Sequence, residues 1–353
     1  MADLLDLVAT LVDIPSVSFN ESALADYVEG RLRALPGLQV DRVGDNVVAR
    51  TGGTGALRRR VIVAGHLDTV PPNGNERARV EGDTLWGLGA TDMKGGLAVM
   101  LEIAARAHEA RDDLSLIFYV AEEVARVHSG LLQLRRERPD FVEADVALIC
   151  EPTSGAVEAG CQGVIKAEVA LRGARAHVSR PWKGRNALHR LAPLLAAVAH
   201  WNGRTVGLDG CHYVEALQAV TVSGGVASNV VPDEARLEIN HRFAPDRSTE
   251  QAWEWLEGFV APFLEPGDTL TLRDSAPSAP PGLEDPLLAS LVKRSGAPVV
   301  AKLGWTDVAF FAEQGIPAAN FGPGNPELSH TAGEMVTRQS LEDCLGIIWS
   351  VLS

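Results

Sequence analysis

The pattern of apolar residues changes at Val164, and this change limits the folds that the chain can adopt. Before it, Leu114–Val120 and Val146–Cys150 are short, almost entirely apolar runs, as in strands covered by helices on both faces. After it, Ile165–Gly173 alternates apolar and polar residues, as in an antiparallel strand with one exposed face. A length of 353 residues also exceeds what one hydrophobic core usually supports. The sequence therefore predicts two domains with different kinds of sheet.

The part of the chain before Val164 is predicted to be α/β. Helical patterns alternate with short apolar strands, which favours a central, mostly parallel sheet flanked by helices. The strands Asn46–Arg50 and Val61–Ala64 flank the turn sequence TGGTG, which indicates a hairpin. The same alternation returns near the C-terminus. The predicted helices of this α/β part are Leu4–Val12, Ala23–Leu35, Gly96–Ala110, Pro286–Ser295, Asp307–Gln314 and Leu341–Leu352.

The middle of the chain has the element order βαββαβ, which is the order of a ferredoxin-like unit. Its first helix, Asn186–Trp201, is expected to kink or restart at Pro193. The Pro- and Ser-rich stretch Ser275–Gly282 is the expected linker out of this unit. A unit whose ends lie close together can be inserted into a loop of a larger domain. We therefore predict an α/β domain of residues 1–164 and 281–353 and an inserted domain of residues 165–280.

The charge and composition argue against several classes of partner. A net charge of −14 argues against nucleic acid. The N-terminal sequence MADLLDLVATLVDIPSV has three aspartates and no lysine or arginine, unlike a secretion signal, and no apolar run is long enough to span a membrane. We expect a cytoplasmic protein, because its cysteines show no CxxC spacing and no dense framework, as is usual for reduced thiols: Cys150, Cys161, Cys211 and Cys344.

Two motifs near the predicted strand ends carry residues suited to metal chemistry. His66 and Asp68 are two residues apart and so lie on one side of an extended chain, where the carboxylate can hold the second nitrogen of a metal-bound imidazole. The glycine-rich loop Trp86–Gly96 carries Asp92; it lacks the GxGxxG spacing of a nucleotide loop. Taken singly, the first motif is also explained as a polar turn, and Asp92 as the N-cap of the next helix.

Two adjacent strands are predicted to end in glutamate. One precedes the pair Glu122 and Glu123, and the other precedes Glu151. Carboxylates at the carboxyl ends of α/β strands lie where ligands usually bind, although exposed surface charges are the alternative. Because neighbouring residues of a strand point to opposite faces, a shared site for Glu122 and Glu123 requires the strand to end and the chain to turn at Ala121.

A late loop adds His330, which alone would be interpreted as an ordinary surface residue. With the preceding motifs it completes a set of two imidazoles and three carboxylates, which suits zinc or a similar divalent ion. Five ligands are too many for one catalytic zinc ion that keeps an open position, but they serve two ions if one carboxylate bridges. The candidate ligands are His66, Asp92, Glu123, Glu151 and His330.

The motifs GHLDTVP, GATDMKGG and AEE, the Glu-Pro after a strand and the late histidine resemble, in order, those of the dinuclear zinc family of amidohydrolases and exopeptidases. This family includes aminoacylases and carboxypeptidase G, and the resemblance covers nearly the whole chain. It implies that the inserted domain serves as a lid and as the contact of a homodimer. It also implies two divalent metal ions, zinc or alternatively cobalt or manganese, and a cis peptide bond between Asp92 and Met93.

The resemblance implies a role for each ligand. Asp92 would bridge the two ions; His66 and Glu151 would complete one site, and Glu123 and His330 the other.

Three further residues receive catalytic roles from the same resemblance. Glu122 would be the general base that takes a proton from the water between the metals and passes it to the leaving nitrogen. Asp68 would orient His66. His177, in ARAHVSRP, would reach the active site of the partner subunit and polarise the scissile carbonyl; without the family context it would be interpreted as a solvent-facing loop residue. A metal-binding module without turnover is the alternative class, but it would have no use for Glu122.

The desuccinylase branch of the family is the most similar one, on the segments EPTSG, ASNVVP and LGWTDVAFF. It implies an anionic N-acyl amino acid substrate, N-succinyl-L,L-2,6-diaminopimelate, which is hydrolysed to succinate and L,L-diaminopimelate. The chain departs from the better-known members by Cys161–Gln162 in place of an arginine pair and by GWTD in place of Gly-Thr-Ser-Asp. An acetylornithine deacetylase, another N-acyl amino acid hydrolase or a metallo-exopeptidase is the alternative. Expected substrate contacts are Asn229, Arg242, Gly304 and Thr306, although Arg242 could instead pair with a protein acid.

Overall fold

The computed structural model describes residues 3–52 and 58–353, which form two compact units. Unit 1 consists of Met1–Gly160, Pro281–Val300 and Phe310–Ser353, and unit 2 of Cys161–Pro280 and Ala301–Ala309. Unit 2 therefore takes in Ala301–Ala309, which the sequence analysis assigned to the larger domain. The reason is a long-range backbone contact, since the N–H of Gln162 donates to the carbonyl of Lys302.

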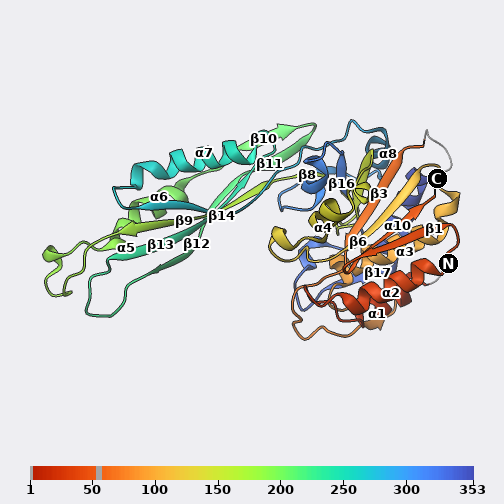
Figure 1. The fold of residues 1–353 in the computed structure, drawn as a ribbon, viewed down its shortest axis with the longest axis horizontal. Coiled ribbons are helices and arrows are strands. Elements are labelled where there is room, and N and C mark those ends of the chain that lie inside the picture. The colour runs from red at the N-terminus through yellow and green to blue at the C-terminus, as the bar shows by residue number, and fades with distance from the viewer. Residues whose placement is uncertain (1–2, 53–57) are drawn as a thin grey trace. The chain divides into compact units, whose positions relative to one another are not determined.

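Unit 1 is built on an eight-stranded sheet with the order β1-β2-β6-β3-β7-β16-β8-β15 (Figure 1). The four neighbouring strands β6, β3, β7 and β16 are parallel, and the strands that pair with them on either side, β2 and β8, are antiparallel. This confirms the predicted α/β class with a mostly parallel central sheet. The strands are β1 (Leu38–Val43), β2 (Asn46–Thr51), β3 (Arg60–His66), β6 (Asp113–Tyr119), β7 (Val146–Ile149), β8 (Val157–Cys161), β15 (Val299–Lys302) and β16 (Ala318–Asn320).

The predicted hairpin between β2 and β3 is wrong. In the described part of the chain these strands do not pair, because β6 lies between them, antiparallel to β2 and parallel to β3. The hairpin partner of β2 is β1, and Gly44 and Asp45 connect the two strands. Residues 53–57 of the predicted turn lie outside the described residues.

Helices complete the hydrophobic core of unit 1. Its buried cluster joins apolar side chains of the sheet to those of α1, α2, α3, α8 and α10. Helix α3 is buried from Gly95 to Ala104, because α1 and α10 pack on it as well as the sheet. No helix within residues 3–52 and 58–353 is both long and apolar enough to cross a membrane. The helices are α1 (Leu4–Val12), α2 (Ser22–Arg33), α3 (Gly95–Arg106), α4 (Gly130–Glu137), α8 (Pro286–Ser295), α9 (Val308–Ala312) and α10 (Arg338–Leu352).

A small three-stranded sheet holds the loop before α3 against the segment before α10. Its order is β17-β5-β4, with both pairs antiparallel. The strands are β4 (Arg79–Glu81), β5 (Thr84–Trp86) and β17 (Met335–Thr337).

Unit 2 contains a four-stranded antiparallel sheet with the order β12-β13-β9-β14. Helices pack on one face of it, and alternate residues of β13 are buried accordingly. This confirms the predicted ferredoxin-like order, and the first helix restarts near Pro193 as expected. The hairpin of β10 and β11 was not predicted. The elements are β9 (Gly163–Arg172), α5 (Ala187–Arg190), α6 (Ala192–His200), β10 (Thr205–Leu208), β11 (Cys211–Val214), β12 (Ala216–Gly224), β13 (Glu234–Phe243), α7 (Thr249–Val260) and β14 (Thr269–Ala276).

Candidate metal centre

Three parallel strands bring candidate residues to one edge of the unit 1 sheet. His66 is the last residue of β3, Glu122 and Glu123 follow β6, and Glu151 follows β7. The expectation that the two strands preceding glutamates are adjacent is wrong, because β3 lies between β6 and β7. Since all three strands run in the same direction, the histidine and the glutamates meet at their carboxyl ends.

The chain turns sharply between β6 and the glutamate pair, as predicted. The strand ends at Tyr119, and Ala121 has a φ of +60°, in the left-handed region that residues other than glycine seldom adopt. The N–H groups of Glu122 and Glu123 then both donate to the carboxylate of Asp68, at 3.0 and 3.1 Å. An extended strand would point these two N–H groups in opposite directions.

Asp92 lies in the irregular turn Ala90–Lys94 that precedes α3. The interpretation of Asp92 as a helix N-cap is wrong: the N-cap of α3 is Lys94, and no described side chain caps that end. The peptide bond between Asp92 and Met93 is cis, which confirms the expectation from the resemblance.

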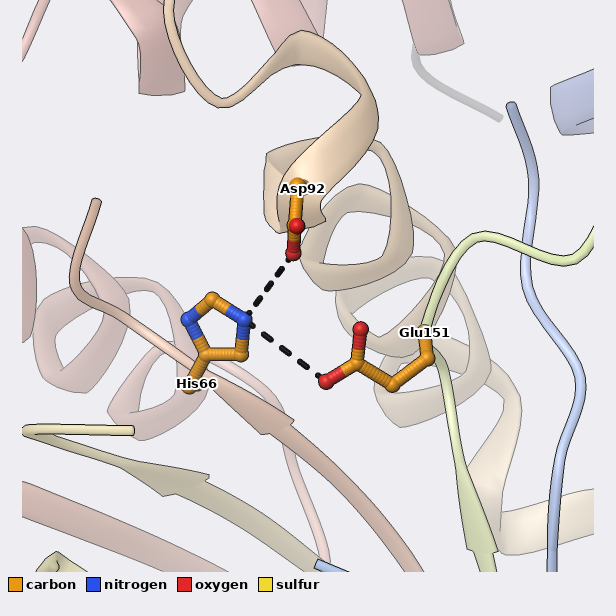
Figure 2. Close-up of side chains that lie close together, drawn as sticks. All are labelled: His66, Asp92 and Glu151. Atoms are coloured by element: carbon orange, nitrogen blue, oxygen red, sulfur yellow. Dashed lines mark hydrogen bonds and ion pairs between the residues drawn. The ribbon is translucent and has the colours of Figure 1, made fainter. Parts of the chain in front are cut away.

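His66, Asp92 and Glu151 form a first group of possible metal ligands (Figure 2). Nε2 of His66 lies 3.2 Å from Oδ1 of Asp92 and 3.7 Å from Oε1 of Glu151. Figure 2 shows both carboxylates directed at the same edge of the imidazole ring.

A second group shares Asp92 with the first. Nε2 of His330 lies 2.9 Å from Oε1 of Glu123 and 3.5 Å from Oδ2 of Asp92. The two carboxylate oxygens of Asp92 thus face different histidines, as a bridging ligand requires. A third group of atoms close enough to hold one ion comprises His66, Glu122 and Glu123.

The charges of this centre fit cations. Burial alone would lower the pKa of His66, but the nearby carboxylates of Asp68 and Asp92 raise it well above its ordinary value. The carboxylates of Asp92 and Glu123 raise the pKa of His330 to about 10. Burial favours the neutral form of Asp92, but the two histidines outweigh it and hold its pKa well below the usual range. The carboxylates therefore favour positive charge at this centre, and divalent ions bound there would supply it, so the donor set fits such ions.

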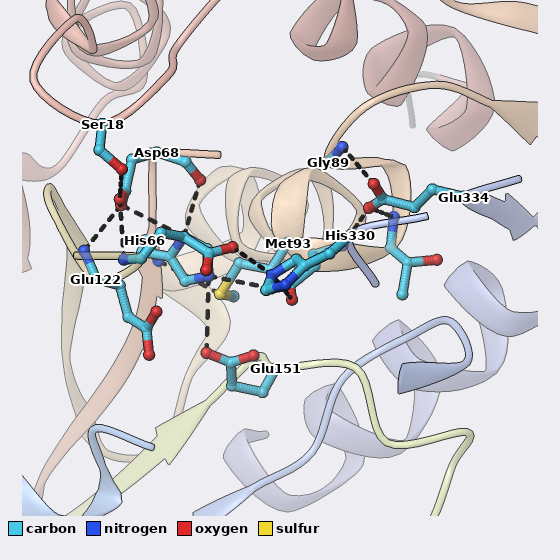
Figure 3. Close-up of polar contacts among 12 residues, drawn as sticks. Ser18, His66, Asp68, Gly89, Met93, Glu122, Glu151, His330 and Glu334 are labelled. Carbon is cyan, nitrogen blue, oxygen red and sulfur yellow. Dashed lines mark hydrogen bonds and ion pairs between the residues drawn. The ribbon is translucent and has the colours of Figure 1, made fainter. Parts of the chain in front are cut away.

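Asp68 contacts His66 through its backbone oxygen, whereas the sequence predicted a contact through its carboxylate. Nδ1 of His66 lies 3.0 Å from the backbone oxygen of Asp68 but 3.5 Å from the carboxylate, which is longer than an ordinary hydrogen bond. The carboxylate instead accepts hydrogen bonds from the hydroxyl of Ser18, at 2.8 Å, and from the backbone of the glutamate pair (Figure 3). Asp68 therefore connects the histidine strand to the Glu122–Glu123 turn.

Two residues of this network, Ser18 and Glu334, received no role in the sequence analysis. Glu334 accepts hydrogen bonds from three backbone N–H groups of the loop that carries Asp92. A lone serine or glutamate in a loop has no spacing signal that distinguishes it from a surface residue.

His177 and Asn229 lie near each other in unit 2, since His177 forms an isolated bridge with Val230. Both are exposed. Nδ1 of His177 accepts hydrogen bonds from the N–H and the hydroxyl of Ser179, at 3.2 and 2.8 Å, which leaves the proton of a neutral imidazole on Nε2.

Arg242 is half-buried on β13, and no acid pairs with it among the described residues. Its Nε–H donates to Oδ1 of Asn240 at 3.1 Å. Burial lowers the pKa of Arg242. In the described structure Arg242 therefore does not pair with a protein acid, which was the alternative interpretation.

The departures from the family pattern lie in buried surroundings. Cys161 faces the backbone oxygen of the buried Thr306, with Sγ at 3.7 Å, and Gln162 donates its amide N–H to Val214 at 2.8 Å. Gly304 is exposed. Because Cys161 and Gln162 are turned into the protein, they do not replace the missing arginine pair as exposed donors.

Comparison with known proteins agrees with this geometry. Residues 62–353 match the family model described as peptidase family M20/M25/M40. The chain belongs to peptidase family M20/M25/M40. A succinyl-diaminopimelate desuccinylase of Corynebacterium glutamicum is 42% identical to this family member over 100% of the chain and 97% of its own length. A Mycobacterium tuberculosis protein that carries the same name provisionally is 47% identical over 95% of the chain and 93% of its own length.

The fold of this M20/M25/M40 member is similar to that of solved structures. The crystal structure of a tripeptidase (SAV1512) from Staphylococcus aureus superposes with a TM-score of 0.82 at 21% identity, covering 99% of this chain and 97% of that one. The predicted family and fold class are therefore confirmed.

Proposed function

We propose that this chain is a metal-dependent amidohydrolase that cleaves N-succinyl-L,L-2,6-diaminopimelate to succinate and L,L-diaminopimelate. The observation that carries the reaction type is Asp92, whose two carboxylate oxygens face His66 and His330, beside the glutamate pair. The relatives at 42% and 47% identity, matched over nearly their full lengths, support the substrate.

Two divalent ions are the proposed cofactors, zinc in the first place and cobalt or manganese as alternatives. Asp92 would bridge them, with His66 and Glu151 completing one site and Glu123 and His330 the other; the two ligand groups that share Asp92 support this assignment. When bound, such ions supply Lewis acidity, which polarises an amide carbonyl and acidifies a water molecule.

Glu122 is the proposed general base. Its carboxylate takes a proton from the attacking water and delivers it to the amide nitrogen as the C–N bond breaks. Its neighbour Glu123 is hydrogen-bonded to His330, which supports a division of the pair into a proton carrier and a ligand. The contact of the Glu122 N–H with Asp68 supports a fixed position for the turn that carries both.

Arg242 is the proposed partner of a substrate carboxylate, together with Asn229. Asn240 occupies the Nε–H of Arg242, so the paired Nη groups remain as a planar fork that matches a carboxylate. Gly304 and Thr306 are proposed as further contacts. The buried Cys161 and Gln162 support a substrate pocket with one arginine fewer than in the better-known branch.

A homodimer through unit 2 is also proposed. Strand β12 is an edge of its sheet, and Val220 and Val222 are 58% and 48% exposed on it. Unpaired edge strands with apolar residues readily pair with a second copy. His177 would then act in the active site of the partner, and its Nε2 proton would polarise the scissile carbonyl. The four cysteines, which form no disulfide in the described chain, support a cytoplasmic location.

The decisive experiment compares kcat/KM of the purified enzyme for N-succinyl-L,L-diaminopimelate and N-acetylornithine. We expect a clear preference for the succinyl compound; a preference for N-acetylornithine would replace the proposed substrate. Metal analysis after purification without chelators should find two ions per chain. Full activity without a divalent ion would contradict the proposed centre.

Glu122→Gln tests the general base. It should retain both ions and lose about 10²–10⁴-fold in kcat, because it removes the proton acceptor but leaves the proposed ligands. The matched control Glu109→Gln, at an exposed position, should leave kcat unchanged. Near-normal turnover of Glu122→Gln with two ions bound would rule out this role.

Subunit mixing tests His177. Inactive His177→Ala subunits mixed with inactive Glu122→Gln subunits should regain part of the activity if His177 acts across the dimer. Mixing that forms heterodimers without restoring activity would contradict that role.

A further inference from the structure

Glu334 is a buried carboxylate whose contacts are all to one loop. Its side chain accepts hydrogen bonds from the backbone N–H groups of Gly89, Thr91 and Asp92, at 3.0, 3.0 and 2.9 Å (Figure 3). The residue is 1% exposed, and its charge acts on the buried ammonium group of Lys94 in the same loop. Burial raises the pKa of this carboxyl, and the three N–H donors oppose that rise. Burying a carboxylate costs free energy, and the three hydrogen bonds offset part of that cost.

The loop needs an acceptor from outside because its backbone is irregular. Gly89 has a φ of +76°, and Asp92 and Met93 have non-helical angles inside the turn before α3. A backbone of this shape cannot satisfy its own N–H groups by a regular helical ladder, and buried N–H groups left unpaired are costly. The two oxygens of Glu334 satisfy three of them at once.

The segment that carries Glu334 also carries His330. The N–H of Glu334 donates to the carbonyl of Thr331, and its own carbonyl accepts the N–H of Gly87. Immediately after it, β17 pairs with β5. The segment is thus attached at several points to the chain that leads into Asp92, so the second histidine and the shared aspartate belong to one hydrogen-bonded assembly.

We propose that Glu334 is a positioning residue that holds the bridging carboxylate of Asp92 where both metal ions need it. It belongs to none of the three groups of possible ligands among the described residues. Because Asp92 is common to the two groups built around it, a displacement of its backbone affects both ions together. This inference rests on the proposed function, since it concerns the proposed metal ligands.

The test measures zinc affinity of the full-length chain by competition with a chelator, and the visible spectrum of the cobalt form. Glu334→Gln keeps the size of the side chain but replaces one acceptor oxygen with a donor, so at least one loop N–H loses its partner. We expect both ions to bind about 10–100-fold more weakly and the cobalt spectrum to change. Glu334→Asp has a shorter side chain whose carboxylate cannot reach all three N–H groups, and it should lose less zinc affinity than Glu334→Gln. It is the variant to measure if Glu334→Gln does not fold.

Glu215→Gln is the matched control. Glu215 is also buried, at 3% exposed, and accepts a backbone N–H, that of Ala244, but it lies in unit 2. This variant should lower thermal stability and leave zinc affinity and the cobalt spectrum unchanged. Unchanged affinity and spectrum in both Glu334 variants would overturn the positioning role alone. Failure of the unsubstituted chain to bind divalent ions would overturn the proposed metal centre and this inference with it.

Discussion

Oδ1 of Asp92 lies 3.2 Å from Nε2 of His66, so a carboxylate and an imidazole are within hydrogen-bond distance at the candidate metal centre. His330 makes a similar contact with Glu123. Nearby carboxylates raise the pKa of His66 well above its ordinary value and that of His330 to about 10. A divalent ion that binds through either imidazole would therefore compete with a proton.

We therefore expect the apparent affinity for zinc to rise with pH. Each proposed site contains one histidine that loses a proton on binding, so each dissociation constant should fall about ten-fold per pH unit between pH 6 and pH 8. Chelator competition at several pH values measures this directly. Affinity that does not change over this range would show that the histidines are already neutral.

Asp68→Asn should loosen the turn that carries the glutamate pair. The carboxylate of Asp68 accepts hydrogen bonds from Ser18 and from the N–H groups of Glu122 and Glu123, whereas an amide has a single acceptor oxygen. We expect a loss of about 1–3 kcal/mol in the free energy of unfolding and a reduced kcat. Ser18→Ala, which removes only one donor, should cost about 0.5–1.5 kcal/mol. Urea denaturation measures both, and equal costs would argue against a special role for the carboxylate.

Gly96→Ala should be strongly destabilising. A Cβ at Gly96 would lie 2.3 Å from the backbone oxygen of Cys150 and 2.9 Å from Cε of Met93, so α3 would have to move away from β7. We expect a loss of about 2 kcal/mol or more. The matched control is Gly346→Ala in α10, where a Cβ meets no described atom within 4 Å. This substitution should stabilise the helix by about 0.5–1 kcal/mol. Thermal unfolding distinguishes the two; equal melting temperatures would contradict the packing argument.

His241 should make the protein less stable at mildly acid pH. It is buried among Trp201, Phe243 and Trp255, and neither ring nitrogen has a partner among the described residues. Burial lowers its pKa to about 4, and the charge of Arg247 acts in the same direction.

The sign follows from the direction of this shift. Below pH 6.5 the unfolded chain binds a proton on His241 that the folded protein does not, so stability is present above that pH and is lost as the pH falls towards 4. Between pH 7 and pH 5 the loss should be about 2 kcal/mol. His241→Phe should remove this part of the pH dependence, and His108→Gln, at an exposed position, should retain it. Urea denaturation at both pH values provides the test. If the free energy of unfolding falls by the same amount in His241→Phe as in the unsubstituted protein, the prediction is contradicted.

The local pattern of apolar and polar residues was sufficient to predict the two kinds of sheet. A segment alternates, as Ile165–Gly173 does, when one of its faces is buried, and it is almost entirely apolar, as Leu114–Val120 is, when both are. This difference is visible in a few consecutive residues. The turn at Ala121 was predictable for a similar reason, because two neighbouring side chains with a common site cannot lie in one extended strand.

Only the tertiary structure decided which strands are neighbours. The apolar runs of β2, β3 and β6 are compatible with several pairings, and their order depends on backbone hydrogen bonds between segments distant in sequence. For the same reason the sequence did not predict the roles of Glu334 and Ser18, whose partners are distant in sequence. The type of each candidate ligand was visible in the sequence by itself, because metal chemistry depends on the side chain. What holds Asp92 and Asp68 in place is decided by backbone N–H groups and buried oxygens that meet only when the chain is folded.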